Sequence, residues 1–387
     1  MPAVKSSILV ASTSTPITSN PSDDIQAAWV APKYPVPITE TLSFICPILV
    51  RGNTNLGDMN QVSGSLMGVS VVLPILNEER DLRESVSAIL AQNYSAPFEV
   101  ILALGPSTDR TNEIAEELAA SDSRVVLVDS PTGRTANGLN AAIARAKYSI
   151  ISRIDGHAEI SPTYLRDATE LLNKTGAVNV GGIMAAVGKS KFEKAVATAM
   201  RSPLGVGSSR FHTGGKAGPA DTVYLGTFKK SALLEAGGYD ERFTRAQDWE
   251  LNFRLRKNGG TIWFDPSLVV TYRPRSTIKA LAKQYFQYGT WRRAVSRSHK
   301  GSVNLRYLAP PTALAVNALS IILGLFISPI FFLPVATYLA LILIGSLFLG
   351  KSAIEKLILP TVLVTMHMVW GAGYLSSPKG LMAEEAE

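Results

Sequence analysis

The chain has 387 residues, of which 46% are hydrophobic and only 18% are charged, and its formal net charge is +7. This length allows one large domain or two ordinary ones. The single cysteine, Cys46, excludes an internal disulfide. No nucleic-acid recognition motif accompanies the positive charge, so we expect no nucleic acid as a partner.

The N-terminal region, residues 1–66, opens with a stretch rich in Ser, Thr and Pro and lacks the continuous apolar core of a signal peptide. We predict that this extension is disordered, or that it precedes the true start of the protein at Met59 or Met67.

Strand and helix patterns alternate from residue 69 to residue 155. Apolar, β-branched runs predict buried strands at 69–75, 98–104, 124–129 and 148–154. Amphipathic segments predict helices at 79–91, 111–120 and 135–147. This alternation predicts an α/β fold with a parallel sheet covered by helices on both faces. Ligands bind such sheets beyond the carboxyl ends of the strands, where polar residues gather in this sequence.

The pattern loosens between residues 160 and 272. Residues 221–243 predict a strand followed by a helix, and residues 247–260 predict an amphipathic helix that stops at glycine. Residues 261–272 predict a pair of strands around Pro266. A basic, aromatic helix is expected at 276–290.

Two long uncharged runs follow, from Leu308 to Gly350 and from Leu357 to Pro378. A membrane-spanning helix needs about 20 apolar residues, so we predict three spans near 309–328, 331–349 and 357–376. Buried helices of a soluble domain are the alternative.

Nine Lys or Arg and no acidic residue lie from Arg273 to Arg306, next to the first predicted span. Positive residues mark the cytoplasmic flank of a span, and the membrane is therefore an expected partner. The predicted organisation is an extension at 1–66, a globular domain at 67–272, a basic juxtamembrane segment at 273–307, a membrane region at 308–378 and a tail at 379–387.

The strand predicted at 148–154 is followed by Asp155, Gly156 and His157. Both polar side chains would reach one cation if the chain turns at the glycine. A carboxylate suits Mg²⁺ or Mn²⁺, and an imidazole favours Mn²⁺ or another transition metal. A turn with a capping Asp and a surface His is the alternative, and these three residues alone do not decide between the two.

The ordered set of motifs resembles glycosyltransferase family 2, which comprises inverting, nucleotide-sugar-dependent enzymes of the GT-A fold. "VSVVLPILNEERDL" resembles the family's opening strand and helix, and "GPSTDRT" its nucleotide-binding loop. "GRTANGLNAAIARAKYSIISRIDGHA" is similar to the segment that leads into the Asp-x-Asp metal motif. "RAQDWELNFRLRKNGG" resembles the Glu-Asp catalytic-base motif, and "QYFQYGTWRRA" the Gln-x-x-Arg-Trp region. The resemblance covers about residues 69–300. Asp-Gly-His and the apolar C-terminal part resemble the succinoglycan-biosynthesis type.

The resemblance implies a binding site for the nucleotide sugar. Pro74, Glu78 and Asp109 would line the nucleoside pocket, and Arg134 would contact the base or the phosphates. Asp155 would face the ribose and the diphosphate through a divalent metal, Mn²⁺ or Mg²⁺, and His157 would bind that metal directly.

The resemblance also implies the catalytic groups. Asp248 would be the general base, and Arg292 or Arg293 would hold the departing diphosphate; Gly226 and Phe228 would fall in the acceptor region. Each has a simpler alternative, because an acid at a helix start favours the dipole and arginines beside a span can face lipid head groups.

The sequence departs from the family pattern in three motifs. Leu104, Gly105 and Pro106 stand where the family often has two acids before its Ser-Thr-Asp. His157 replaces the second acid of Asp-x-Asp, and Gln247 replaces the Glu of the base motif.

The sequence thus predicts a transferase in the inner cell membrane, multi-pass, with its catalytic domain in the cytoplasm. It would move a hexose from a nucleotide sugar to a lipid-linked glycan acceptor, and we expect the donor to be UDP-linked. Other glycan-assembly proteins are further candidate partners. The alternatives are a polyprenyl-phosphate sugar synthase, a catalytically degenerate assembly partner, and a transporter, which the small number of predicted spans disfavours.

Overall fold

The computed structural model describes residues 67–384. The extension predicted at 1–66 lies outside the described residues. The strands are β1 (Val69–Ile75), β2 (Phe98–Leu104), β3 (Val125–Asp129), β4 (Ile150–Arg153), β5 (Glu159–Ile160), β6 (Asn179–Ala186), β7 (Gly218–Pro219), β8 (Tyr224–Lys229) and β9 (Ile262–Tyr272). The helices before the C-terminal region are α1 (Leu82–Leu90), α2 (Thr111–Ser121), α3 (Thr135–Arg145), α4 (Tyr164–Thr175), α5 (Lys191–Met200), α6 (Pro203–Val206), α7 (Arg210–Thr213), α8 (Lys230–Glu235) and α9 (Gln247–Lys257).

One sheet runs through the globular part in the order β3-β2-β1-β4-β8-β6-β9-β5, with β7 paired to β9. The first four strands in this order are parallel to one another, as the alternating pattern predicts. β8 is antiparallel to both of its neighbours. The sheet therefore has a parallel half, whose carboxyl ends form one edge, and a mixed half.

The prediction of two strands within 261–272 is wrong, because β9 is a single strand of eleven residues. Its pairing with β6 shifts register between Gly181 and Ile183. Opposite that shift, the Asp265 carboxylate accepts a hydrogen bond from the Ser267 amide at 2.9 Å. Pro266 therefore lies in a bulge, where proline is tolerated inside a sheet.

Two apolar cores cover the two faces of the sheet. One contains the inward side chains of α1, α2 and α4, including Leu82, Ile114 and Leu165. The other contains those of α3, α8 and α9, including Leu139 and Leu251. Helices thus pack on both faces, in agreement with the sequence pattern.

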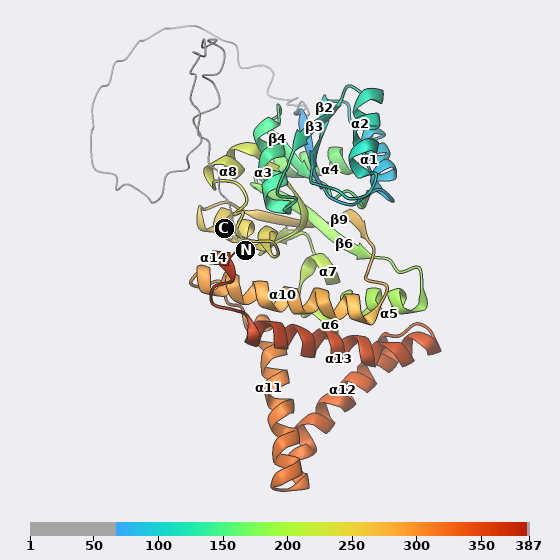
Figure 1. Cartoon of the computed structure of the whole chain (residues 1–387), viewed down its shortest axis with the longest axis vertical. Coiled ribbons are helices and arrows are strands. Elements are labelled where there is room, and N and C mark those ends of the chain that lie inside the picture. The colour runs from blue at the N-terminus through green and yellow to red at the C-terminus, as the bar shows by residue number, and fades with distance from the viewer. Residues whose placement is uncertain (1–66, 385–387) are drawn as a thin grey trace, which may run out of the picture. The chain divides into compact units, whose positions relative to one another are not determined.

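The C-terminal region contains α10 (Ile278–Ser298), α11 (Leu305–Phe326), the 3₁₀ turn η1 (Pro329–Phe332), α12 (Leu333–Leu349), α13 (Ala353–Ser376) and α14 (Leu381–Glu384). Figure 1 shows α11 and α12 diverging from a shared tip like the arms of a V. α13 runs across the open end of the V, beside α10.

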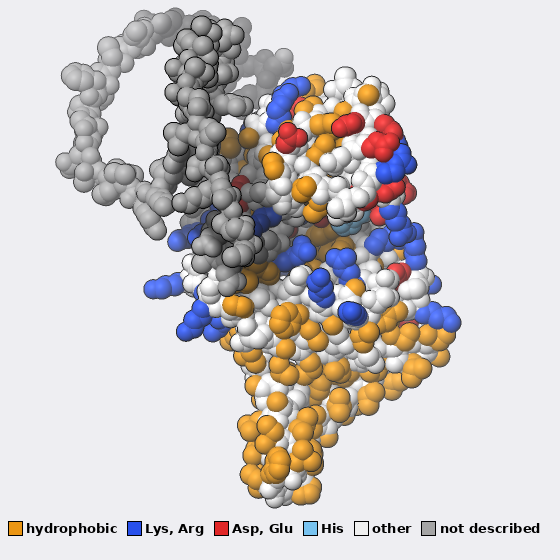
Figure 2. Space-filling model, viewed as in Figure 1, with side chains coloured by type: hydrophobic (Ala, Val, Ile, Leu, Met, Phe, Trp, Pro, Cys, Tyr) orange, Lys and Arg blue, Asp and Glu red, His pale blue; other side chains and the backbone are white. Residues whose placement is uncertain are grey.

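Three helical segments are long and apolar enough to cross a membrane, namely α11, η1 with α12, and α13. α13 nevertheless differs from the other two, because it packs lengthwise against the globular part. Leu359, Leu363 and Met366 are buried in one cluster with residues of α5 and α10. Figure 2 shows the V of α11 and α12 as a largely hydrophobic surface, with Lys and Arg gathered above it.

Glycines allow α10 and α13 to approach closely. A Cβ added at Gly289 would lie 2.0 Å from the Trp370 carbonyl oxygen, and one at Gly373 would lie 2.1 Å from that of Phe286. Beyond α13, Arg297 of α10 donates to the Pro378 carbonyl at 2.7 Å. The chain after α13 therefore returns to the end of α10, next to the globular part.

Candidate active site

Arg153, the last residue of β4, joins two of the predicted site residues. Its guanidinium donates to the Asp155 carboxylate at 3.0 Å and also to the carboxylate of Asp248. The Arg153 side chain is only 5% exposed. Burial alone would lower the pKa of Arg153, but the charges of Asp155 and Asp248 raise it well above its ordinary value. Arg153 therefore stays charged and holds the two carboxylates together.

Asp248 lies in the first turn of α9, after Ala246 in a left-handed conformation with φ of 61°. Burial, together with the negative charge of Asp155, raises the pKa of Asp248, whereas Arg153 opposes that rise. The Asp248 side chain is 36% exposed, so water reaches part of it and moderates the effect. A carboxylate with a raised pKa is a better proton acceptor than an ordinary one.

Buried polar contacts fix α9 in place. Asn252 accepts a hydrogen bond from Asn179 of β6 at 2.8 Å and donates one to Thr222 at 2.9 Å. Glu250 is fully buried, and it pairs with Arg254 at 2.7 Å and with His299, just beyond α10, at 2.8 Å. The helix that carries Asp248 is thus tied both to the sheet and to the C-terminal end of α10.

His157 lies at the edge of the sheet near Asp155 and pairs with Glu78. Its Nδ1 is 2.9 Å from a carboxylate oxygen of Glu78. That hydrogen bond raises the pKa of His157, although burial opposes the rise. In the described part of the chain Nε2 of the ring has no hydrogen bond, so it is left for another partner. A carboxylate on the second ring nitrogen is the usual arrangement around a metal-binding histidine.

Asp155 and His157 fit a divalent cation only as part of its coordination. Within residues 67–384, no group of three or more His, Cys, Asp or Glu is placed to hold a metal. The two side chains offer one oxygen and one nitrogen donor, a set that suits Mn²⁺. The remaining positions would have to come from a ligand such as a diphosphate.

The residues predicted for the nucleoside pocket lie at the same sheet edge. The Asp109 carboxylate accepts a hydrogen bond from the Glu79 amide at 3.3 Å, and its hydrogen bond with Thr111 lowers its pKa. The turn after β2 is therefore held against the turn after β1. Pro74 lies in β1 opposite Ala103 of β2, and Arg134 precedes α3.

Arg292 and Arg293 point to different surroundings. The Arg292 guanidinium lies 4.4 Å from the ring centre of Trp249, the residue after Asp248. The Arg293 guanidinium lies 5.0 Å from the ring of Tyr374 and donates to its hydroxyl at 3.2 Å. Of the two, only Arg292 packs against the start of α9.

Gly226 and Phe228 lie inside the protein and are not brought to the edge with Asp155. Phe228 is 3% exposed and belongs to the core under α3 and α9. A Cβ at Gly226 would lie 2.2 Å from the Asn179 side chain, so this glycine makes room for the buried Asn179–Asn252 contact. Both positions serve packing in this structure.

Sequence reasoning missed Arg153 and Tyr239. The Arg153 guanidinium lies 6.0 Å from the ring centre of Tyr239, whose pKa burial raises strongly. The available signal was an arginine inside an apolar strand, since a charge is rarely buried without a partner.

This architecture is the GT-A glycosyltransferase fold. It is similar to the structure titled mannosyltransferase PcManGT from Pyrobaculum calidifontis in complex with GDP-Man and Mn²⁺. The TM-score is 0.56 at 19% identity, over 81% of this chain and 88% of the other.

The chain belongs to glycosyltransferase family 2. The sequence model "Glycosyl transferase family 2" matches residues 70–235. The succinoglycan biosynthesis protein ExoA of Rhizobium meliloti is 32% identical over 79% of this chain and 93% of its own length. A Methanococcus voltae enzyme is 26% identical over 81% of this chain and 97% of its own length. It is called dolichyl N-acetyl-alpha-D-glucosaminyl phosphate 3-beta-D-2,3-diacetamido-2,3-dideoxy-beta-D-glucuronosyltransferase. The protein is therefore a glycosyltransferase of polysaccharide or lipid-linked glycan synthesis.

Proposed function

We propose that the protein is an inverting transferase that moves a hexose from a nucleotide sugar, UDP-linked, to a hydroxyl of a lipid-linked glycan. The observation that carries this proposal is the arrangement of Asp155 and Asp248 around Arg153. One carboxylate lies at the sheet edge where a nucleotide would bind, and the other has the raised pKa of a proton acceptor.

In this proposal Asp248 takes the proton from the acceptor hydroxyl as that oxygen attacks the anomeric carbon. The bond from the anomeric carbon to the donor phosphate breaks on the opposite face, and the nucleoside diphosphate leaves. Arg153 keeps Asp248 oriented and separates its charge from that of Asp155. A single displacement of this kind inverts the anomeric configuration.

Asp155 and His157 would hold the divalent cation together with the diphosphate of the donor. Such a cation neutralises negative charge on the departing diphosphate. Glu78 would orient the His157 ring so that Nε2 faces the site. The GDP-Man and Mn²⁺ named with the PcManGT structure support a nucleotide sugar and a metal as ligands.

The lipid-linked acceptor is inferred from the membrane region and from a relative. Apolar helices and a basic flank would bring the site to a membrane surface. The name of the Methanococcus relative describes transfer to a sugar carried on dolichyl phosphate. We place the protein in the inner membrane with its catalytic domain in the cytoplasm, because Lys and Arg flank the spans on that side.

A donor screen tests the proposal directly. Membranes that contain the protein are incubated with UDP- and GDP-linked hexoses and Mn²⁺, and the lipid products are analysed by mass. We expect one hexose to be added to a lipid-linked glycan, and Asp248→Asn to abolish the addition. No product with any donor would contradict the proposal. Full activity of Asp248→Asn toward a polyprenyl phosphate would instead identify a polyprenyl-phosphate sugar synthase, since that acceptor arrives already ionised.

A further inference from the structure

Arg292 is stacked in an aromatic cluster at the boundary between the globular part and the apolar helices. Its guanidinium lies 4.4 Å from the ring centre of Trp249 and 4.3 Å from that of Tyr307, near the start of α11. Burial lowers the pKa of Arg292 from its ordinary value. Within the described residues, its Nη1 atom is buried and has no hydrogen-bond acceptor.

Two further nitrogen atoms near Tyr307 are also buried without a hydrogen-bond acceptor in the described residues. The Arg306 guanidinium lies 4.8 Å from the Tyr307 ring centre, and its Nε is also buried without an acceptor in the described part of the chain. The same holds for Nε1 of Trp249. Arg306 has one acidic neighbour, Asp221, at 3.6 Å, and the Asp221 side chain is half exposed.

Within the described residues, three donors without an acceptor thus lie on side chains that pack around the rings of Trp249 and Tyr307. Such donors are costly unless an acceptor reaches them. A buried donor without a partner costs about 1–3 kcal/mol, and more when it is charged. Burial, together with the nearby charge of Arg306, lowers the pKa of His212 to about 3, so this imidazole is neutral. An anion can accept hydrogen bonds from guanidinium groups and from an indole N–H, and its bonds to the guanidinium groups are charge-assisted and therefore strong.

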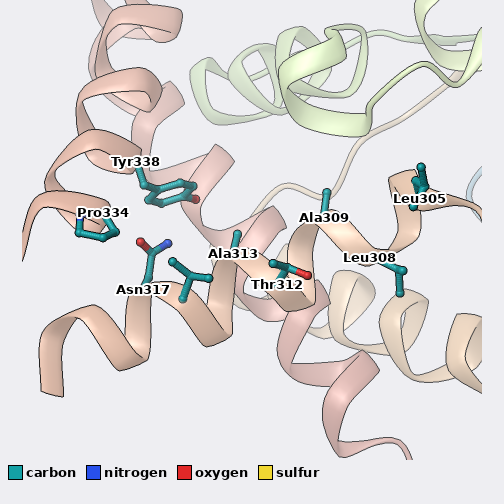
Figure 3. Close-up of a pocket in the computed structure, with 9 residues that line it drawn as sticks. Leu305, Leu308, Ala309, Thr312, Ala313, Asn317, Pro334 and Tyr338 are labelled. Atoms are coloured by element: carbon teal, nitrogen blue, oxygen red, sulfur yellow. The ribbon is translucent and has the colours of Figure 1, made fainter. Parts of the chain in front are cut away.

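An apolar groove begins at Leu305, the chain neighbour of Arg306. It has a volume of about 450 Å³ and lies between α11 and α12. Figure 3 shows α11 side chains from Leu305 to Asn317 along the groove, with Pro334 and Tyr338 of α12 at one end. Leu305 directly precedes Arg306. The segment of α11 from Leu305 to Asn317 spans twelve residue steps, or about 18 Å of helix. Both walls are helices long and apolar enough to cross a membrane, and such a groove suits an apolar chain.

We propose that the donor cluster of Trp249, Arg292 and Arg306 binds the phosphate or diphosphate of the lipid acceptor, and that the groove between α11 and α12 holds its hydrocarbon chain. This inference rests on the proposed function and names the site of its acceptor. It assigns Arg292 to the acceptor's phosphate and not to the departing diphosphate of the donor. The cluster adjoins the base, because Trp249 follows Asp248 in α9.

Charge and shape together select this occupant. A free nucleotide has no chain for the groove, and a neutral lipid has no anion for the arginines. A bulk phospholipid has both parts, but it carries no sugar hydroxyl for Asp248, the residue before Trp249 in α9. The acceptor's phosphate is therefore the one source to which the inference commits.

Binding of geranylgeranyl diphosphate to the full chain in phosphatidylcholine nanodiscs tests the inference by calorimetry, without a sugar donor. Arg306→Gln removes one donor, and Ala313→Phe fills the groove. We expect each to weaken binding at least tenfold. The matched controls are Arg201→Gln, at an exposed arginine, and Ala318→Phe, at an exposed position of α11 outside the groove. Both should stay within twofold of the wild type.

Inorganic diphosphate and geranylgeraniol should each bind far more weakly than the complete probe. Unchanged binding in Arg306→Gln and Ala313→Phe would overturn the inference, as would equal competition by phosphatidylglycerol. A parallel sugar-transfer assay separates the two proposals. Normal transfer by both variants contradicts the lipid site alone, whereas specific diphosphate binding without transfer from any donor contradicts the proposed function alone.

Discussion

At the scale of single residues, Arg153 determines the charge state of the candidate base. We expect Arg153→Gln to lower kcat about a hundredfold, because Asp248 would lose its orienting partner and face Asp155 without a counter-charge. The pKa of Asp248 would then rise further. Initial rates measured against pH test this prediction.

The direction of the pH effect follows from the role of Asp248 as a proton acceptor. Only the deprotonated form accepts a proton, so the rate should rise with pH through a pKa above the ordinary value of 3.8. Arg153→Gln should move this acidic limb to higher pH, and Arg153→Lys should partly restore it. The surface pair of Arg166 and Asp167 provides a control, since Arg166→Gln should leave the profile unchanged. An unshifted limb in Arg153→Gln would contradict the assigned role.

His157 and Glu78 can be separated by their effects on metal binding. We expect His157→Ala to abolish metal-dependent transfer while the thermal unfolding temperature stays unchanged, because the ring is partly exposed. Glu78→Gln should weaken Mn²⁺ binding about 10- to 100-fold, as loss of a carboxylate partner of a metal-binding histidine does. Electron paramagnetic resonance of Mn²⁺ with added UDP measures metal binding by both variants. Wild-type turnover of His157→Ala without metal would contradict the metal site.

At the scale of elements, the contact of α10 with α13 depends on glycine. Gly289→Ala would place a methyl group 2.0 Å from the Trp370 carbonyl, so backbone would have to move. Alanine favours a helix over glycine by about 1 kcal/mol, but overpacking costs about 1–3 kcal/mol. We therefore expect a net loss of stability, seen as a lower thermal unfolding temperature in nanodiscs.

Gly345 of α12 is the matched control for that substitution. Its added Cβ would meet the side chain of Leu204 at 2.5 Å, and a flexible side chain can turn aside where a backbone cannot. Gly345→Ala should therefore leave the unfolding temperature nearly unchanged. A Gly289→Ala protein as stable as this control would show that α10 and α13 do not pack closely.

The local residue pattern predicted the bounds of helices and strands better than it predicted which distant residues contact one another. β1 and β2 have the bounds that their apolar runs indicate, and α9 begins at Gln247 as its pattern suggests. The prediction of two strands around Pro266 was wrong, because the sequence does not distinguish a proline in a bulge from a proline at a strand end. Arg153 and Asp248 are 95 residues apart in the chain, and no periodicity reports a contact at that separation.

At the scale of the whole molecule, the position of α13 bears on how many of the three candidate spans would cross a membrane. Composition predicts a third span at 357–376, and α13 does contain this segment. Hydropathy cannot distinguish a helix buried in lipid from one buried against protein, and here one side of α13 packs against α5 and α10. We therefore predict that two helices, α11 and α12, insert into the membrane and that α13 lies along its surface.

The location of the C-terminus tests this arrangement. With two crossing helices the tail stays on the catalytic side, where Arg297 already contacts Ser377 and Pro378; a third span would carry it to the other side. Single cysteines at Glu387 and at Ser328, near the tip of the V, are introduced into a Cys46→Ser chain. We expect an impermeant maleimide added to inside-out vesicles to label Glu387→Cys, and the same reagent added to intact spheroplasts to label Ser328→Cys. Labelling of Glu387→Cys from the spheroplast side would show that α13 crosses the membrane.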